Sequence, residues 1–307
     1  MLRFTLQRLL TGIPTLLVLV AAAFFLIRAA PGGPFDRERQ LPPEIEANIR
    51  RAYHLDEPLA LQFGRYLGNL ARGDFGPSLQ YREFSVTELI GAGFPVSLRI
   101  GALAMLLAVA IGVAAGTWAA LRQNQAADHL VMAAAMSGIS IPNFVMAPLL
   151  VLLLGVTLGW LPAGGYGEGE WRYVVLPVVT LALPQVAYLA RLTRASMIEV
   201  LSSAYIRTAR AQGLSVATVV LRHALKPALL PVVSYLGPAT AAIVTGSVVI
   251  EQIFGLPGIG RFFVNGALNR DYTLVMGVVV FYGALILACN FLVDVVYGLL
   301  DPRIRHL

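Results

Sequence analysis

The residues that could carry out chemistry are few in this sequence, and they are scattered. The four histidines form no His-Glu-x-x-His pair; they are His54, His129, His223 and His306. The single cysteine, Cys289, lies in an apolar run and excludes both an internal disulfide and a Cys-x-x-Cys site. No Gly-x-Ser-x-Gly elbow is present. We therefore expect no catalytic residues and no metal site in this chain.

The residues needed to bind a nucleotide are also absent from the sequence. The single lysine, Lys226, is followed by Pro227, so the chain has no Gly-x-x-x-x-Gly-Lys-Ser/Thr loop to hold the phosphates of ATP. The run Gly255-Leu-Pro-Gly258-Ile-Gly260 could cradle a phosphate, but Pro257 and the absence of a preceding strand favour a tight structural turn.

Carboxylates that could bind a coupling ion are nearly absent from the apolar runs. Glu251 and Asp294 lie near the ends of two of these runs. This argues against an ion-coupled carrier, although backbone carbonyls can also hold sodium. The chain carries no visible energy source of its own.

The most distinctive segment is a basic stretch between two apolar runs, residues 191–231. It contains one acid, Glu199, and six basic side chains, which are Arg191, Arg194, Arg207, Arg210, Arg222 and Lys226. Apolar spacing predicts a helix over Ser196–Gln212, with Gly213 as its stop and Ser215 as the cap of a second helix, Val216–Lys226.

Two interpretations of the basic stretch remain open on composition alone. It is either a helical hairpin that binds a partner on the cytoplasmic side or a solvated face that follows the positive-inside rule.

The elements around this stretch are membrane spans. Of the 307 residues, 57% are hydrophobic and 13% charged, whereas soluble domains carry about 25% charged residues. We predict an all-α membrane protein with spans at 9–28, 98–121, 130–158, 173–190, 229–250 and 274–296. The first run is too long for the apolar core of a cleaved signal peptide and is predicted to remain as a span. The net charge of +6 is explained by arginines beside the spans and does not indicate nucleic-acid binding.

The predicted organisation has three parts: residues 1–30, a polar cap at 31–97, and a five-helix core at 98–307 with the cytoplasmic loop 191–228. The cap includes a charged helical pattern at 43–50. The third span is interrupted by Ser137-Gly-Ile-Ser-Ile-Pro142, which indicates either a lining of the transport path or a packed kink. Short loops on one side carry eleven Arg or Lys against three on the other, so both termini are predicted to be cytoplasmic.

Several motifs carry a resemblance to a known family. The coupling loop of type I ABC importer permeases is similar to Ala204-Tyr-Ile-Arg-Thr-Ala-Arg-Ala-Gln-Gly213-Leu and the following Arg222-His-Ala-Leu-Lys-Pro-Ala-Leu-Leu-Pro231. The sequence departs from the general Glu-Ala-Ala-x-x-x-Gly pattern, because Arg207-Thr208-Ala209 precedes Gly213, as is usual in the peptide-transport branch. Gly73-Asp-Phe-Gly-Pro-Ser-Leu79, Pro31-Gly-Gly-Pro-Phe35 and Val249-Ile-Glu-Gln-Ile-Phe-Gly-Leu-Pro-Gly-Ile-Gly260 resemble the oligopeptide permeases of the peptide/nickel branch.

The resemblance implies a type I ABC importer permease fold of six transmembrane helices with a small extracytoplasmic domain between spans 1 and 2. It implies a non-catalytic subunit of an oligopeptide importer in the bacterial cytoplasmic (inner) membrane. The implied partners are a second homologous permease, two ABC ATPase subunits that bind ATP and Mg, an extracytoplasmic peptide-binding protein and membrane lipid. The chain itself would hold no cofactor.

The resemblance also implies roles for individual residues. Residues expected to couple to the ATPase are Tyr205, Arg207, Thr208, Ala209, Arg210, Gly213 and Leu214. Residues expected to meet the binding protein are Arg261, Asn265, Asn269, Arg270 and Asp271. Residues expected to line the path are Ser137, Ser140, Pro142 and Asn143.

Three alternative functions are considered for this sequence. The same machine could carry dipeptides, glutathione or nickel. The chain could instead be a self-sufficient secondary carrier or channel, or a membrane enzyme, for which it lacks the residues.

Overall fold

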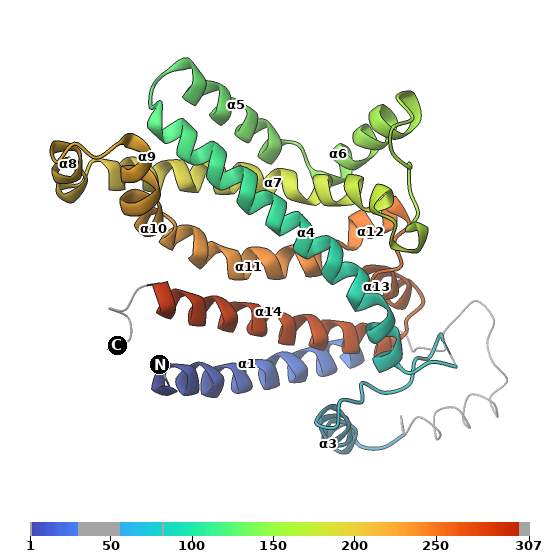
Figure 1. Ribbon diagram of the computed structural model, residues 1–307. Helices are drawn as coiled ribbons and strands as arrows, with labels where there is room; N and C mark the ends of the chain where they lie inside the picture. The colour runs from blue at the N-terminus through green and yellow to red at the C-terminus, as the bar shows by residue number, and fades with distance from the viewer. Residues whose placement is uncertain (1, 30–55, 82, 301–307) are drawn as a thin grey trace.

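A computed structural model describes residues 2–29, 56–81 and 83–300 of the chain. The described residues form helices, and apart from an isolated bridge between Pro77 and Ser85 they contain no strand (Figure 1). The charged pattern at 43–50, the Pro31–Phe35 motif and the tail 301–307 lie outside the described residues.

The six predicted spans fall on four continuous helices and two bent helix pairs. The continuous helices are α1 (Leu2–Ala29), α4 (Val86–Leu121), α7 (Trp171–Leu201) and α14 (Tyr272–Leu300). The third span is α5 (Ala126–Ser140) followed by α6 (Asn143–Leu150) and the π-helix η1 (Val151–Thr157), with a bend of 103°. The fifth comprises α9 (Val216–Thr218), the π-helix η3 (Val219–Ala224) and α10 (Leu225–Ala228), then α11 (Leu230–Gly246) after a bend of 51°.

The core of the molecule forms where α4 packs against α7. Small residues allow the two backbones to approach closely, as is common between membrane helices. A Cβ atom placed on Gly116 would lie 2.4 Å from the carbonyl oxygen of Ala190, and one on Gly112 would lie 2.7 Å from Cβ of Leu189. Ile100 and Leu176 are fully buried beside this crossing.

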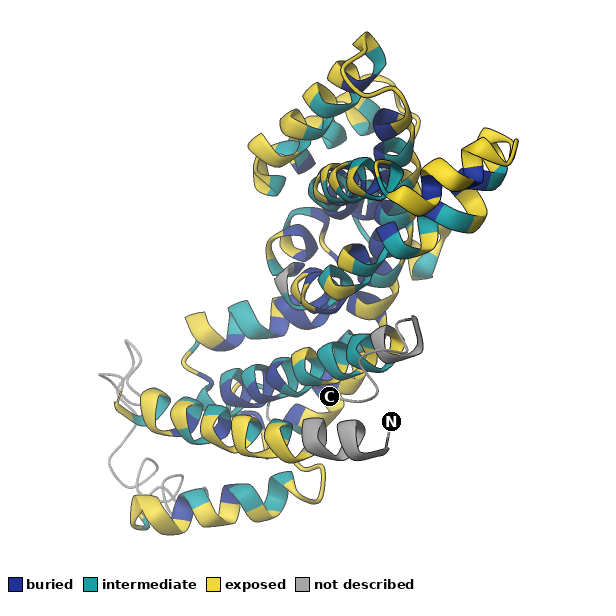
Figure 2. Cartoon of the chain, turned by 90° about the vertical axis from the view of Figure 1, so that its left-hand side faces the viewer, coloured by how far each residue is buried: buried dark blue, intermediate teal, exposed yellow. Residues whose placement is uncertain are grey.

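Helix α14 joins a second layer to this core, since it packs against α11 on one side and α1 on the other. Much of α1 is exposed in Figure 2, because it contacts the rest of the chain along a single stripe that includes Val20 and Phe24. Helix α3 (Leu59–Leu70) closes the end of this layer, with Tyr66 against Phe24.

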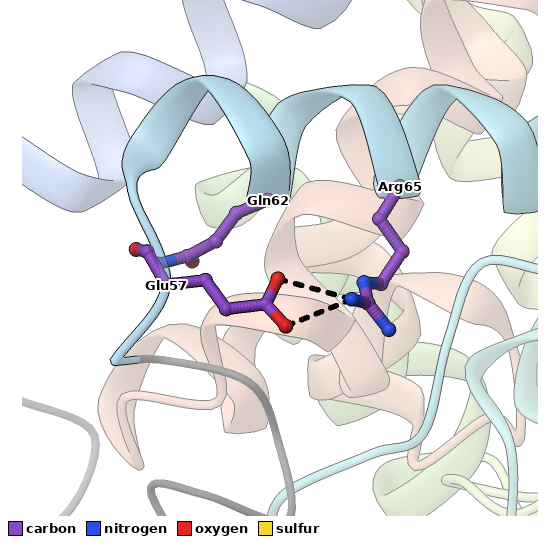
Figure 3. Close-up of polar contacts among 3 residues, drawn as sticks. All are labelled: Glu57, Gln62 and Arg65. Atoms are coloured by element: carbon purple, nitrogen blue, oxygen red, sulfur yellow. Dashed lines mark hydrogen bonds and ion pairs between the residues drawn. The ribbon is translucent and has the colours of Figure 1, made fainter.

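Helix α3 is the described helix of the predicted cap. Arg65 Nη2 binds both carboxylate oxygens of Glu57, at 2.8 and 3.1 Å, and Gln62 Nε2 donates to the carbonyl of Glu57 at 2.7 Å (Figure 3). Burial against α1 raises the pKa of the Tyr66 hydroxyl above its ordinary value. Hydrogen bonds to Glu57 therefore fix the start of the helix, and its aromatic face packs against α1.

The second span begins earlier than predicted, at Val86 instead of residue 98. Ser85 and Glu88 form a capping box: the Ser85 hydroxyl accepts from Glu88 N at 3.2 Å, and Ser85 N donates to Glu88 Oε2 at 2.7 Å. The helix then continues through Pro95, so the predicted boundary at 97/98 falls inside α4.

Two further boundaries differ from the prediction. The single helix expected over Ser196–Gln212 is wrong, because α7 ends at Leu201 and a separate helix, α8 (Ala204–Ala211), follows a turn at residues 202–203. The second helix does not stop at Pro227. It continues after the wider π-turn of η3 as far as Ala228. The proline therefore contributes to the bend of the span and does not end the helix.

Candidate functional site

The basic segment forms a compact helical unit at one end of the molecule, where Figure 1 shows α8, α9 and α10 gathered together. Ile206 and Ala209 on one face of α8 are buried. They pack with Met197 near the end of α7, with Val219 and Val220 of η3, and with Ala120 of α4. This apolar seat packs α8 against η3 and the end of α7, within a cluster that also includes Ala120 of α4.

The opposite face of α8 is exposed. Arg207, Thr208 and Arg210 point to solvent, and Tyr205 is 49% exposed. Beyond the helix, Leu214, Val216 and Leu221 are also exposed hydrophobic residues, with Val216 66% exposed. Among the described residues nothing covers this mixed basic and apolar surface.

The predicted end of α8 is confirmed in detail. Gly213 has a φ of +79°, which favours glycine, and no neighbouring atom would lie within 4 Å of a Cβ placed there. Ser215 caps the next helix by accepting from Thr218 N at 3.3 Å. Of the predicted coupling residues, Ala209 packs inside the seat, and the others lie on or beside the exposed surface.

An ion pair that was not predicted from the sequence joins two helices next to this unit, α5 and α7. Arg194 on α7 binds Asp128 on α5 through Nε–Oδ1 at 2.5 Å and Nη2–Oδ2 at 2.7 Å. Asp128 is 1% exposed and also accepts from Asn124 N at 2.9 Å. Because 66 positions separate the partners, no local pattern in the sequence pairs them.

The four predicted path residues lie at the bend of the third span. Ser137, Ser140 and Pro142 are exposed, and Asn143, at the first position of α6, is half-buried. Both serine hydroxyls donate within their own helix, to Ala133 and Met136. Around them α5, α6 and η1 expose many large apolar side chains, including Leu130, Met136, Phe144, Leu149, Leu152, Leu153 and Val156.

A buried carboxylate organises the opposite end of the core. Glu251, on α12 (Val248–Phe254), is 1% exposed. Its Oε1 accepts from the hydroxyls of Ser97 and Ser247, each at 2.6 Å, and its Oε2 accepts from Gly260 N at 2.7 Å. Ser97 also accepts from Ile259 N at 3.0 Å. We call Ser97, Ser247, Glu251 and the amides of Ile259 and Gly260 the Glu251 network.

The Glu251 network explains the glycine-rich run, and the predicted tight turn is confirmed. Gly255, with a φ of +64°, ends α12, and the chain then turns into α13 (Ile259–Leu268). A Cβ on Gly258 would lie 2.4 Å from the Glu251 carboxylate, so no side chain fits there. The carboxylate takes the position at the N-terminus of α13 where a bound phosphate would lie.

The segment between the predicted fifth and sixth spans is largely helical, because α13 lies within it. Arg261 and Arg270 are exposed, whereas Asn265 and Asn269 are half-buried. Asp271 is fully buried and accepts from the Ser78 hydroxyl at 2.5 Å, from Gln80 N at 3.0 Å and from Leu274 N at 3.0 Å. Asp271 therefore ties the 73–81 loop to the start of α14 and presents no carboxylate to a partner.

The predicted residues therefore fall into three separate regions: the coupling surface at one end, α13 at the other, and the bent third span between them. The described residues contain no group of three His, Cys, Asp or Glu side chains placed to hold a metal ion.

Comparison with known proteins gives two family matches. Residues 112–306 match the model "Binding-protein-dependent transport system inner membrane component". Residues 1–91 match the model of the N-terminal part of such membrane components.

Individual relatives agree with these matches. The chain is 56% identical over 306 residues to the oligopeptide transport system permease protein OppB of Salmonella typhimurium, with all of both chains covered. It is 44% identical to the dipeptide transport system permease protein DppB of Bacillus subtilis, over 99% of this chain and 98% of that one. Among solved structures, a chain of the methionine ABC transporter MetNI in an inward-facing conformation superposes with a TM-score of 0.57 at 18% identity, covering 69% of this chain and 96% of that one. The last likeness concerns the fold alone.

Proposed function

The chain belongs to the inner membrane components of binding-protein-dependent transport systems, and from this membership we propose that it is one permease subunit of an ATP-driven oligopeptide importer. In this proposal it forms half of the path across the cytoplasmic membrane, and partner ATPase subunits bind ATP and Mg. The oligopeptide cargo is supported by 56% identity to OppB of Salmonella typhimurium, against 44% to DppB of Bacillus subtilis.

The observation that carries the coupling role is the two-faced character of α8. Its inner face is fixed by Ile206 and Ala209 to α4, α7 and η3. Its outer face offers Arg207 and Arg210 beside Tyr205, with Leu214 and Val216 following. Closure of an ATPase pair against this face would displace α8, and the apolar seat would pass the displacement to the spans.

The second permease is proposed to cover the bent third span. Its exposed apolar face, from Leu130 on α5 to Val156 on η1, surrounds a helix break, and a break inside a membrane is tolerated where protein or a water-filled cavity covers it. Ser137, Ser140, Pro142 and Asn143 would then lie at the boundary between the two subunits, where a weakly polar path suits peptides of varied sequence.

The binding protein is proposed to dock at the α13 end, where Arg261 and Arg270 are exposed and Asn265 and Asn269 are half-buried. Asp271 holds this surface in place from within. Both termini and α8 are accordingly proposed to lie on the cytoplasmic side, and the eleven-to-three distribution of Arg and Lys between the loops supports this orientation.

The test is a tagged purification of this chain from its host in mild detergent. Two ATPase subunits and a second permease should be recovered with it, and a peptide-loaded binding protein should stimulate ATP hydrolysis. Arg207→Glu combined with Arg210→Glu should release the ATPases and leave the second permease bound. Arg72→Glu, an exposed arginine just after α3, is the control. A chain that moves solute without ATPase subunits would overturn the proposal.

Cargo length has a separate test. Binding protein loaded with dipeptides or with longer peptides should stimulate ATP hydrolysis differently, and the longer peptides should give the larger rate. A larger rate with dipeptides, glutathione or nickel would assign that cargo instead.

A further inference from the structure

A long apolar groove runs along the surface between α4 and the bent fifth span. Its volume is about 480 Å³. One wall is α4 from Val109 to Leu121, and the other comprises residues of η3, α10 and α11 from Val220 to Leu236. The lining side chains are aliphatic apart from Trp118 and Thr117. Both walls belong to segments that are apolar enough to cross a membrane, so the groove lies in the membrane-spanning part of the chain.

The length of the groove matches one leaflet of a bilayer. The 12 helical steps from Val109 to Leu121 span about 18 Å at 1.5 Å per residue. Half of a typical hydrocarbon core is about 15 Å. A groove of this length can hold the acyl chain of a lipid from the leaflet on whose side the groove opens. The groove extends only slightly past the midplane of the bilayer.

Three cations directly follow lining residues at the end of the groove nearest the coupling unit. Arg122 follows the last residue of α4 and lies over the Trp118 ring at 5.2 Å. Arg222 and Lys226 directly follow the lining residues Leu221 and Leu225. All three are exposed, and none of them has a carboxylate partner among the described residues. A tryptophan with unpaired cations at the end of a span marks the level of lipid headgroups.

We propose that this groove is a binding site for one anionic phospholipid of the leaflet on the coupling side. An acyl chain fills the groove, and the headgroup phosphate is held by Arg122, Arg222 and Lys226. Guanidinium groups suit phosphate oxygens, and basic pockets between membrane helices select anionic headgroups. The bound lipid joins α4 to the η3–α10 segment on which α8 is seated. A consequence for ATPase stimulation rests on the function proposed above, whereas the binding itself does not.

The test uses Trp118 as a reporter in the full chain. The two other tryptophans, Trp160 and Trp171, are 64% and 65% exposed and are replaced by phenylalanine. The chain is placed in phosphatidylcholine nanodiscs that contain rising fractions of a brominated lipid. This lipid is either phosphatidylglycerol or phosphatidylcholine, and in both cases the bromine lies near the glycerol end of the acyl chain. Brominated phosphatidylglycerol should quench Trp118 at a lower fraction than brominated phosphatidylcholine.

Variants of the chain distinguish a selective preference for phosphatidylglycerol from general contact with lipid. Each of Arg122→Gln, Arg222→Gln and Lys226→Gln should reduce the preference for phosphatidylglycerol, by up to about fivefold, and the triple variant should abolish it. The matched control replaces Arg72, Arg172 and Arg261, which are exposed and lie outside the groove, and should retain it. Ala114→Phe fills the groove and should weaken quenching by both lipids without changing the cations.

Equal quenching by the two lipids, or a preference that survives the triple variant, would overturn the proposal. Loss of quenching by both lipids once the second permease is bound would also overturn it, because protein would then cover the groove. Recovery of the ATPase subunits is measured separately. Failure of that recovery with lipid preference intact counts against the coupling role alone.

Discussion

At the scale of single residues, the molecule uses its few buried charges to join segments that are distant in the sequence. Glu251 joins α4 and α13 through Ser97 and Gly260, and Asp271 joins the 73–81 loop to α14. Each carboxylate accepts hydrogen bonds at a helix N-terminus, where unpaired backbone N–H groups and the helix dipole stabilise a negative charge. These acids are therefore structural, and the α13 end depends on both of them.

Replacing Glu251 by Gln should lower the free energy of unfolding by about 2 kcal/mol. The amide group introduces a donor where the carboxylate accepts three hydrogen bonds, so at least one of them is lost. SDS titration of the purified chain in mixed micelles measures this. The exposed Glu168→Gln is the control, and an equal effect of the two substitutions would contradict the assignment.

A second residue-scale prediction compares two ion pairs in one chain. The pair Arg194–Asp128 includes a carboxylate that is 1% exposed, whereas the side chains of Arg65 and Glu57 are 46% and 24% exposed (Figure 3). Double-mutant cycles with Arg→Gln and Asp→Asn or Glu→Gln should give a coupling energy of about 2 kcal/mol for the first pair and about 0.5 kcal/mol for the second. Coupling energies of similar size would show that Asp128 is solvated.

At the scale of elements, the proposed coupling role of α8 requires that its inner face be held firmly. Ile206 is fully buried between η3 and the end of α7, and truncation of a core isoleucine to alanine removes about 2–5 kcal/mol of stability. Ile206→Ala should therefore increase amide hydrogen exchange across residues 203–214. Tyr205→Ala, on the exposed face of the same helix, should leave exchange unchanged. Equal exchange in the two variants would mean that α8 is not held by this seat.

Alanine substitutions at two glycines test backbone conformation and helix packing separately. Gly213→Ala should cost about 1 kcal/mol, because its φ of +79° disfavours a side chain although the space around it is open. Gly116→Ala should prevent folding, because its Cβ would lie 2.4 Å from the Ala190 carbonyl oxygen at the α4–α7 crossing. Yield and melting temperature in detergent measure both effects. Similar melting temperatures would contradict the tight crossing.

Much of the element order was predictable from the sequence, for physical reasons that are local. Apolar runs of about 20 residues indicate spans, Gly213 and Ser215 indicate the turn after α8, and Gly255 with Pro257 indicates a turn. The boundaries were not predictable where helix continues outside the apolar run, as at Val86, or breaks within a polar one, as at residues 202–203.

The buried polar contacts were not predictable because their partners are far apart in the sequence. Ser97 lies 154 positions from Glu251, and Ser78 lies 193 from Asp271. The amphipathic α13 was also missed, because glycines and an asparagine in Ile259–Leu268 resemble a loop in composition.

At the scale of the whole molecule, the exposed surface differs in character from one region to another. The α8 end is basic and apolar, the α13 end carries Arg261 and Arg270, and the bent third span shows a broad apolar face. The assembly proposed above would cover each of these surfaces with a different partner. Removing the apolar side chains Phe144 and Leu149 by Phe144→Ser and Leu149→Ser should reduce recovery of the second permease at least tenfold without affecting the monomer's melting temperature. The lipid-exposed Leu106→Ser, on α4, is the control.

The π-helix η3 gives the fifth span one residue more than an α-helix of the same rotation would hold. A π-turn holds more residues than an α-turn, so η3 behaves as an α-helix with one residue inserted, and the wider turn absorbs that residue. Deleting one residue from Val219–Ala224 would restore α geometry and leave the segments on either side in nearly the same relative orientation. Deleting one residue from the α-helical α11 would instead turn the preceding segment by about 100° around the helix axis. The direction in which Arg207 and Arg210 face therefore tolerates a one-codon deletion in η3 and not one in α11, although every side chain of α8 stays the same in both.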